Sequence, residues 1–190
     1  MKPILQVDDD PNDVFLLQRA MKRMGVANPI QVATDGRQAI DYLQGAGKFA
    51  DREKFPFPCL VLLDLKLPYV MGLEVLRAVR KKPGTALTIV MLTASAEEGD
   101  IVAAYRLGAN AFLTKPSEAS KLEEMVKSIK DFWLTHNTLP MRTSEAPIEG
   151  VVTLGIVATT NLVAKRGPPV KGGGREEWPH EAEATKSGAS

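Results

Sequence analysis

The sequence is poor in the residues that build disulfide-bonded and zinc-binding proteins, since its 190 residues include one cysteine and two histidines. A single cysteine, Cys59, cannot close an internal disulfide. It lies directly before an apolar run, so we interpret it as a small core residue. The near absence of cysteine fits a protein of the reducing cytoplasm.

The sequence also lacks an excess of charge and any long hydrophobic run. Its formal net charge is +1, which gives no electrostatic indication of a nucleic-acid partner. No stretch approaches the ~20 apolar residues of a membrane-spanning helix, and the segment at 1–7 is too short for a signal peptide. With 44% hydrophobic and 25% charged residues, the composition is that of a globular protein. We therefore expect a soluble cytoplasmic protein with no membrane and no nucleic-acid partner.

Short apolar runs alternate with segments of helical periodicity along the first 136 residues. Strands are predicted at 4–7, at 30–34, in a run that ends at Asp64, at 87–92 and at 111–113. A helical pattern of apolar residues follows each strand, and the last one extends to Trp133, which we interpret as a core residue. This alternation predicts an α/β domain at 1–136, with a doubly wound parallel sheet of five strands and five flanking helices.

Side chains that can cap a helix precede four of the predicted helices. They are Asp10, Asp35, Ser95 and Ser117. Asp35 is followed three residues later by Gln38, and Ser95 by Glu98, which is the spacing of a capping box. The sequence therefore predicts that these helices begin directly after the four capping residues.

Two segments have a structural interpretation that requires no function. Residues 45–58 form a long connection with three phenylalanines, which we interpret as a surface loop held by its aromatic side chains. Arg77, Arg80, Lys81 and Lys82 lie near the end of the third predicted helix, where positive charge favours the helix dipole. We interpret this basic cluster as a solvated helix end.

Chemically reactive side chains gather where the predicted strands end. Asp8 and Asp9 follow the first strand, Asp64 the third, Thr93 the fourth and Lys115 the fifth. In open parallel sheets the ligand site lies beyond the carboxyl ends of the strands. Three carboxylates crowded there would raise one another's pKa unless a cation lies between them. Oxygen ligands without histidine favour Mg²⁺.

A phosphoryl group would satisfy the chemistry of these strand ends. It is anionic, it binds Mg²⁺, and a carboxylate such as Asp64 can attack it as a nucleophile. Mg²⁺ and Lys115 would neutralise charge on the transferred oxygens. Each of these residues alone is most simply a turn or cap residue. Their joint occurrence at successive strand ends favours a phosphoryl-transfer site.

Four motifs together resemble the receiver domain of two-component response regulators over residues 3–135. They are Val7-Asp8-Asp9-Asp10-Pro11, Leu62-Leu63-Asp64-Leu65-Lys66-Leu67-Pro68 with Gly72, Leu92-Thr93-Ala94 and Thr114-Lys115-Pro116. The loop at 45–58 and the Lys-Leu-Pro after Asp64 are similar to the single-domain regulators that partner bacterial phytochrome histidine kinases. The resemblance implies a flavodoxin-like receiver fold with strand order 2-1-3-4-5.

The resemblance implies that Asp64 is the phosphoacceptor, which takes its phosphoryl group from a kinase phosphohistidine in a Mg²⁺-dependent reaction. Asp9 would be a direct Mg²⁺ ligand, and Asp8 would act through water. Asp64 and the backbone carbonyl of Lys66 would complete the protein ligands. The chain would then be no enzyme, beyond catalysing its own phosphotransfer and dephosphorylation.

The resemblance also implies a switch. Thr93 would move toward the phosphoryl group, Lys115 would form an ion pair with it, and the Lys115–Pro116 peptide bond would be cis. Phe112 occupies the switch-aromatic position, although it could equally be a core residue at the sheet edge.

The resemblance further implies residues that adjust the signal and a surface that presents it. Lys66 and Ser95 would tune how fast the phosphoryl group is hydrolysed. The face made by the fourth helix, fifth strand and fifth helix would rearrange, and it could form a homodimer interface that includes Phe132.

The tail at 137–190 differs in composition from the rest of the chain, being rich in glycine and proline. We expect most of it to be disordered, with a β-forming segment at 151–163; a non-native, frame-shifted extension is an alternative. A DNA-binding regulator with this tail as effector lacks the expected recognition helix. A haloacid-dehalogenase-like phosphotransfer enzyme would need a second aspartate where this chain has Lys66.

Overall fold

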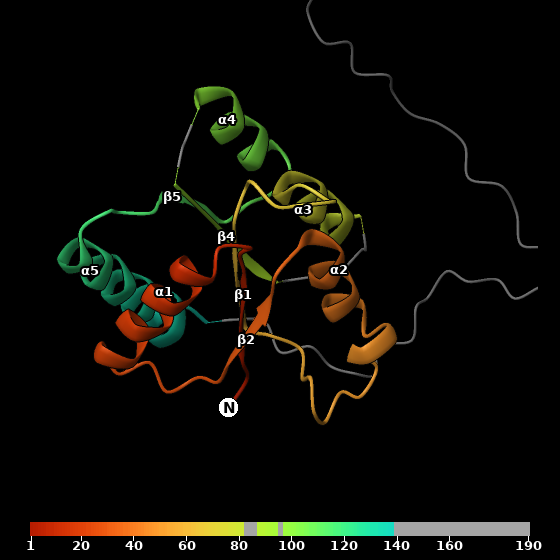
Figure 1. Cartoon of the computed structure of the whole chain (residues 1–190), viewed down its shortest axis with the longest axis horizontal. Helices are drawn as coiled ribbons and strands as arrows, with labels where there is room; N and C mark the ends of the chain where they lie inside the picture. Colours follow the sequence, from red (N-terminus) through yellow and green to blue (C-terminus); the bar gives the residue numbers. More distant parts are fainter. Residues whose placement is uncertain (82–86, 95–96, 139–190) are drawn as a thin grey trace, which may run out of the picture. The chain divides into compact units, whose positions relative to one another are not determined.

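The sheet follows the predicted order. The structure is a computed structural model that describes residues 1–81, 87–94 and 97–138. Its five parallel strands are β1 (Ile4–Val7), β2 (Ile30–Ala33), β3 (Leu60–Leu63), β4 (Thr88–Thr93) and β5 (Ala111–Thr114). They lie in the order β2-β1-β3-β4-β5 (Figure 1), which confirms the predicted doubly wound fold.

Helices cover both faces of this sheet. They are α1 (Pro11–Arg23), α2 (Gly36–Gln44), a short 3₁₀ turn η1 (Gly47–Phe49), α3 (Gly72–Arg80), α4 (Glu98–Arg106), α5 (Ala119–Ile129) and the π-helical segment η2 (Lys130–His136). Figure 1 shows α1 and α5 on one side of the sheet and α2 and α3 on the other. No helix within the described ranges is long and apolar enough to span a membrane. The predicted tail features at 139–190 lie outside the described residues.

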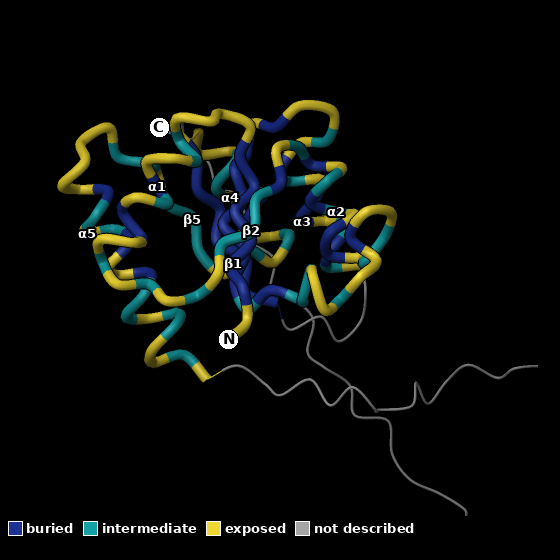
Figure 2. The backbone as a smooth tube through the Cα atoms, turned by 60° about the horizontal axis from the view of Figure 1, so that its bottom comes forward, coloured by how far each residue is buried: buried dark blue, intermediate teal, exposed yellow. Residues whose placement is uncertain are grey.

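The core is divided by the sheet into two layers, because alternate residues of a strand point to opposite faces. Leu5, Val7 and Leu63 pack with α2, α3 and α4 on what we call the α2–α4 face. Leu62 and Val90 pack with α1 and α5 on the α1/α5 face. The central strands β1, β3 and β4 are buried throughout, whereas the edge strands β2 and β5 are only partly buried (Figure 2), as expected for a parallel sheet covered on both sides.

Two residues predicted to be in the core are half-buried. Cys59 and Trp133 both pack against the α1/α5 layer. Phe132, next to Trp133, is 57% exposed and meets the indole edge to face at a centroid distance of 4.6 Å. Trp133 therefore contributes to the core from its margin, whereas the Phe132 ring stays accessible.

Two of the four predicted helix caps are confirmed. Asp10 Oδ1 accepts from the Asn12 backbone N–H at 2.8 Å, and Asp35 Oδ1 accepts from the Gln38 N–H at 2.8 Å. In a capping box the Gln38 side chain would bond to the Asp35 backbone N–H. Here the Gln38 side-chain amide donates to the Asp35 carboxylate instead, at 2.6 Å. Both caps are aspartates, whose charge also favours a helix N-terminus.

The other two predicted caps are wrong. α4 begins at Glu98 with Glu97 as its N-cap, and α5 begins at Ala119 after Glu118. Neither glutamate caps its helix through a side-chain hydrogen bond. Glu98 is thus the first residue of α4, whereas a capping box with Ser95 would require it to be the third. Ser95 itself lies outside the described residues. A glutamate near a helix start can still interact favourably with the helix dipole without a hydrogen bond.

The loop at 45–58 is held by its aromatic side chains, as predicted. Tyr42, Phe49 and Phe55 pack edge to face, with centroid distances of 5.1–6.1 Å. The guanidinium of Arg52 donates to the backbone carbonyls of Tyr42, Leu43 and Phe55. The loop therefore satisfies its own hydrogen-bonding groups beside α2.

The basic cluster at the end of α3 is only partly a solvated helix end. Arg77 and Lys81 are exposed, and Lys82 lies outside the described residues. Arg80 is half-buried and crosses to the turn after α4, where it donates to the Gly108 carbonyl and the Asn110 side chain, both at 2.9 Å. The interpretation was wrong for Arg80 because a long side chain can reach a neighbouring element that the sequence does not identify.

Candidate functional site

A cluster of three carboxylates lies at the carboxyl ends of the two central strands. Asp8 directly follows β1 and Asp64 directly follows β3, and their side chains are almost completely buried. Asp9, beside them, is exposed. One carboxylate oxygen from each lies within 4.8 Å of the other two. We call Asp8, Asp9 and Asp64 the carboxylate cluster.

The ammonium of Lys115 lies against this cluster. Its Nζ is 2.7 Å from Asp8 Oδ2, 2.7 Å from Asp64 Oδ2 and 2.8 Å from Asp13 Oδ2. A lysine ammonium has three N–H donors, so all three are engaged by carboxylates. The sequence predicted Asp8, Asp64 and Lys115 but missed Asp13, because an acidic residue in the first turn of a helix already has an explanation in the helix dipole.

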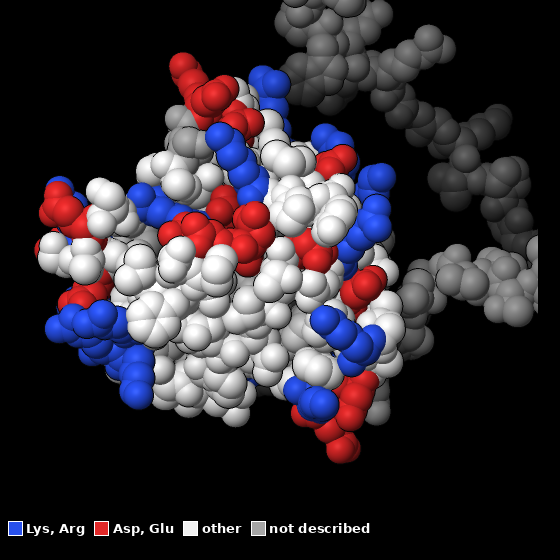
Figure 3. Space-filling model, in the orientation of Figure 1, with Lys and Arg blue, Asp and Glu red and all other residues white. Residues whose placement is uncertain are grey.

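The strand pattern explains why these side chains meet. Residues two apart in a strand point to the same face of the sheet. Leu62 and Leu113 face α1 and α5, so Asp64 and Lys115, each two residues further on, point to that side as well. The Asp64 N–H donates to the Val7 carbonyl at 2.9 Å, which continues the β1–β3 pairing to the site. The side chains therefore reach the α1/α5 side, where the first turn of α1 adds Asp13. In the orientation of Figure 1, Figure 3 shows acidic side chains gathered where β1 leads into α1, with basic side chains beside them.

The ion pairs govern ionisation at the site. Burial raises the pKa of Asp8, and the hydrogen bond and charge of Lys115 only partly offset this effect. Burial alone would lower the pKa of Lys115, but hydrogen bonds to Asp13, Asp64 and Asp8 raise it above the ordinary lysine value. Lys115 therefore carries its positive charge at neutral pH.

A tight turn after β3 fixes the position of Asp64. A Cβ atom at Gly72 would lie 2.1 Å from the Asp64 backbone oxygen, so only glycine fits there. The Gly72 N–H donates to the Leu65 carbonyl at 2.9 Å, which closes the turn. Tyr69 at its tip has a φ of 65°, in the left-handed region that most side chains avoid. The chain thus returns past Asp64 before α3 begins.

The donor set of the carboxylate cluster fits a hard divalent cation. It offers carboxylate oxygens only, and an exposed member, Asp9, gives access from solvent. The remaining oxygens of the buried pair already accept backbone hydrogen bonds: Asp8 Oδ1 from the Asp10 N–H and Asp64 Oδ1 from the Lys66 N–H, both at 3.3 Å. A cation entering here would therefore compete with existing partners of both buried carboxylates.

Comparison with known proteins assigns the chain to a family. Residues 4–127 match the response regulator receiver domain. The chain is also 38% identical over 140 residues to the response regulator Rcp1 of Synechocystis sp. (strain ATCC 27184 / PCC 6803 / Kazusa), covering 73% of this chain and 93% of Rcp1. The chain belongs to the response regulator receiver family.

Solved structures of receivers share this fold. The phosphorylated cyanobacterial phytochrome response regulator RcpA superposes with a TM-score of 0.68 at 36% identity, covering 74% of this chain and 99% of RcpA. The Mn²⁺-bound form of Rcp1 gives a TM-score of 0.67 at 37% identity, covering 74% of this chain and all of that one. The predicted resemblance to regulators that partner phytochromes is thereby confirmed.

The other predicted receiver positions lie around the cluster but are joined to it less directly. Thr93 ends β4 and is buried, and its carbonyl accepts from the Lys115 N–H at 2.8 Å. Phe112 on β5 is half-buried and packs against the α2–α4 layer. The Lys66 side chain is exposed, and Ser95 lies outside the described residues.

The predicted cis bond in this receiver is wrong. The described residues contain no cis peptide bond, so Lys115–Pro116 is trans. Trans is the more stable isomer of an X–Pro bond by about 0.5–1 kcal/mol. In this isomer the Lys115 ammonium already reaches its three carboxylates.

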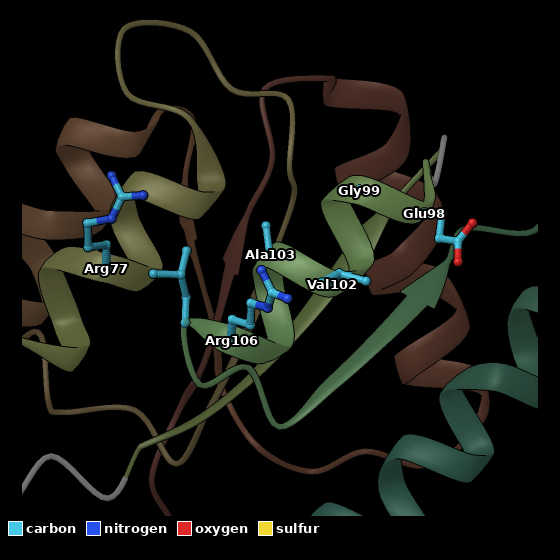
Figure 4. Close-up of a pocket in the computed structure, with 7 residues that line it drawn as sticks. Arg77, Glu98, Gly99, Val102, Ala103 and Arg106 are labelled. Atoms are coloured by element: carbon cyan, nitrogen blue, oxygen red, sulfur yellow. The ribbon is translucent and has the colours of Figure 1, made fainter. Parts of the chain in front are cut away.

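Two hollows differ in their relation to the site. One is lined by residues of the carboxylate cluster together with α1 and β2: Asp8, Asp9, Pro11, Val14, Phe15, Gln18, Val32 and Thr34. The other lies between α3 and α4 (Figure 4), with Arg77 and Arg106 beside the small residues Gly99 and Ala103. It contains none of the predicted site residues.

Proposed function

We propose that this receiver is a single-domain response regulator at residues 1–136, which accepts a phosphoryl group from a histidine kinase onto Asp64. The observation that carries the proposal is the position of Asp64. Its carboxylate is nearly buried at the end of β3, lies within the carboxylate cluster, and is 2.7 Å from the Lys115 ammonium. A nucleophilic oxygen, oxygen ligands for a cation and a fixed positive charge therefore occur at one point.

The reaction transfers the phosphoryl group from nitrogen to oxygen. An Asp64 carboxylate oxygen forms the new P–O bond while the P–N bond of the kinase phosphohistidine breaks, and the bonding pair stays on the imidazole nitrogen. Lys115 balances negative charge on the transferred oxygens. The Gly72 turn keeps the backbone of Asp64 in place, so the carboxylate needs little reorientation. The protein would thus be no enzyme beyond catalysing its own phosphotransfer and dephosphorylation.

We infer that the required cation is Mg²⁺. Asp9, Asp64 and the Lys66 carbonyl would be its protein ligands, with Asp8 acting through water. Bound there, it would neutralise charge on the phosphoryl oxygens. Support comes from the all-oxygen donor set and from the Mn²⁺-bound structure of Rcp1, since both cations favour oxygen ligands.

We propose that phosphorylation is read through Thr93 and Phe112. The added negative charge would draw Thr93 and Lys115 toward the phosphoryl group, and the Phe112 ring would turn inward as Thr93 moves. Lys66 and Ser95 would set the rate of hydrolysis. The lifetime of the aspartyl phosphate in Lys66→Asn tests the role of the exposed lysine: a shorter lifetime supports shielding from water, and an unchanged one excludes it.

The signal would pass to other proteins in the cytoplasm through the face of α4, β5 and α5, which is also the proposed homodimer interface. Tyr105 in α4 and Phe132 in η2, directly after α5, are more than half exposed, although large aromatic rings are usually buried. The similarity to RcpA and Rcp1 supports a phytochrome-type histidine kinase as the phosphodonor. Sedimentation of the protein with and without phosphorylation, compared with Tyr105→Glu, tests the dimer: the variant should stay monomeric in both states.

Incubation with acetyl phosphate and Mg²⁺ tests the central proposal. Intact-mass spectrometry should show one added phosphoryl group on the wild type and on the control Asp41→Ala, which removes an exposed carboxylate from α2. Asp64→Ala should show none, and chelation of Mg²⁺ should prevent modification of every variant. Equal labelling of Asp64→Ala would refute Asp64 as the acceptor.

A further inference from the structure

Asp13 differs from the other carboxylates that contact Lys115. Its Oδ2 lies 2.8 Å from Nζ, as close as the oxygens of Asp8 and Asp64. Its side chain is 34% exposed, however, and it projects from the first turn of α1 rather than from a strand end. It is not part of the carboxylate cluster. Lys115 therefore has one partner that would not be shared with a metal ion.

Cation binding at the cluster requires an exchange of partners. Asp8 and Asp64 each accept a hydrogen bond from the Lys115 ammonium at one carboxylate oxygen and from a backbone N–H at the other. An entering Mg²⁺ must weaken some of these contacts, and it also meets repulsion from the Lys115 ammonium a few ångströms away. A carboxylate outside the cluster that retains this ammonium lowers the free-energy cost of weakening those contacts and of the repulsion between the two cations.

We propose that Asp13 is a positioning residue that retains the Lys115 ammonium when a divalent cation occupies the carboxylate cluster. It keeps a countercharge beside the ammonium, which frees oxygens of Asp8 and Asp64 for the metal and keeps Lys115 beside the acceptor. This inference rests on the proposed function, since it assumes that the cluster binds Mg²⁺. It assigns to α1 a part in metal loading that the strand-end residues alone do not supply.

Calorimetric titration of Mg²⁺ into the full-length protein, with no phosphodonor present, measures the effect directly. Asp13→Asn should weaken Mg²⁺ binding about two- to fivefold, within the range for one partly exposed ion pair. Asp13→Glu, which keeps the carboxylate, should recover most of the affinity. Asp10→Ser is the matched control, because it removes a neighbouring exposed charge yet keeps a residue able to cap α1. Its affinity should stay close to that of the wild type.

A double-mutant cycle separates retention of Lys115 from a general effect of negative charge. In the Lys115→Met background, Asp13→Asn should cause no further loss of affinity. Equal losses in both backgrounds, or equal losses in Asp10→Ser and Asp13→Asn, would overturn the inference and leave the Mg²⁺ site intact. Unchanged affinity in Asp13→Asn would also overturn it. Absence of Mg²⁺ binding by the wild type would instead refute the proposed metal site, and the inference with it.

Discussion

The two faces of the sheet differ in what they bury. The side chains that the α2–α4 layer buries are mainly apolar and include the ring of Tyr42. The strands send polar groups to the other side, where Gln6, Asp8 and Asp64 lie buried toward α1 and α5. One layer therefore supplies stability from hydrophobic burial, whereas the other retains charges that cost stability unless they are paired. We call the α1/α5 face the reactive face and the α2–α4 face the apolar face. The comparison teaches that the stability of the reactive face depends on its ion pairs, whereas that of the apolar face does not.

The largest expected effect is loss of the buried cation. Lys115→Met leaves Asp8 and Asp64 beside one another without their shared partner, and it should lower the free energy of unfolding by about 3–5 kcal/mol. Lys127→Met breaks a pair of similar length, 2.8 Å from Asp131, but both side chains are exposed. Its loss should lower the free energy of unfolding far less than the loss of Lys115, because solvent screens the exposed pair. Urea denaturation without metal measures both, and similar losses would show that burial does not distinguish the two pairs.

The next effect concerns the turn that places the acceptor on the reactive face. Gly72→Ala forces a Cβ atom against the Asp64 backbone oxygen, which should cost about 1–3 kcal/mol and slow phosphorylation by acetyl phosphate. Gly99→Ala is the control, because nothing lies within 4 Å of the added Cβ in α4. It should stabilise the protein by up to about 1 kcal/mol. A Gly72→Ala protein with wild-type stability and phosphorylation rate would contradict the crowded turn.

A smaller effect, a gain in stability, is expected when a buried polar side chain on the reactive face is replaced by an apolar one. Both amide atoms of Gln6 are buried and have no hydrogen-bond partner among the described residues. Gln6→Met keeps the shape and should stabilise the protein by about 1–2 kcal/mol in thermal or urea unfolding. Leu5→Gln places the same amide on the apolar face and should destabilise it by a similar amount. Destabilisation by Gln6→Met would mean that the amide is satisfied and that the faces differ less than described.

The smallest effect lies on the apolar side, at the start of α2. Asp35→Ala should cost about 1 kcal/mol through the lost N-cap. Desolvation would raise the pKa of Asp35, but its hydrogen bonds with Gln38 outweigh this and lower it. Because the folded-state pKa lies below the unfolded value of about 3.9, this stabilisation is present above pH 4 and is lost as the pH falls through the folded pKa. The difference in stability from wild type should therefore narrow below pH 4, and a constant difference would contradict an ionised cap.

The sheet and most of the site were predictable because they depend on local pattern. The apolar runs before Asp64 and Thr93 define strands, and the carboxyl ends of parallel strands meet at one edge. Asp8, Asp64 and Lys115 were therefore predicted to lie together, and the structure confirms their contact. The strand order came from the family resemblance and is also confirmed.

The remaining features depend on contacts between elements that local pattern does not encode. Asp13 reaches Lys115 only because α1 packs against α5 with its first turn beside the end of β5, and Arg80 reaches Asn110 only because α3 and the end of α4 are adjacent. The predicted starts of α4 and α5 were too early, because a serine that can cap a helix does not fix where the helix begins. Local signals thus predicted the residues of the candidate site at the strand ends but not the side chains that support them.

Chemical mapping of the modified residue tests the central claim most directly. The phosphorylated protein would be reduced with borohydride, which converts an aspartyl phosphate to homoserine, and its peptides would be sequenced by mass spectrometry. The account predicts homoserine at position 64 alone, in wild type and in Asp13→Asn. Homoserine at Asp8, Asp9 or Asp13, or an unmodified Asp64 in a phosphorylated protein, would contradict it.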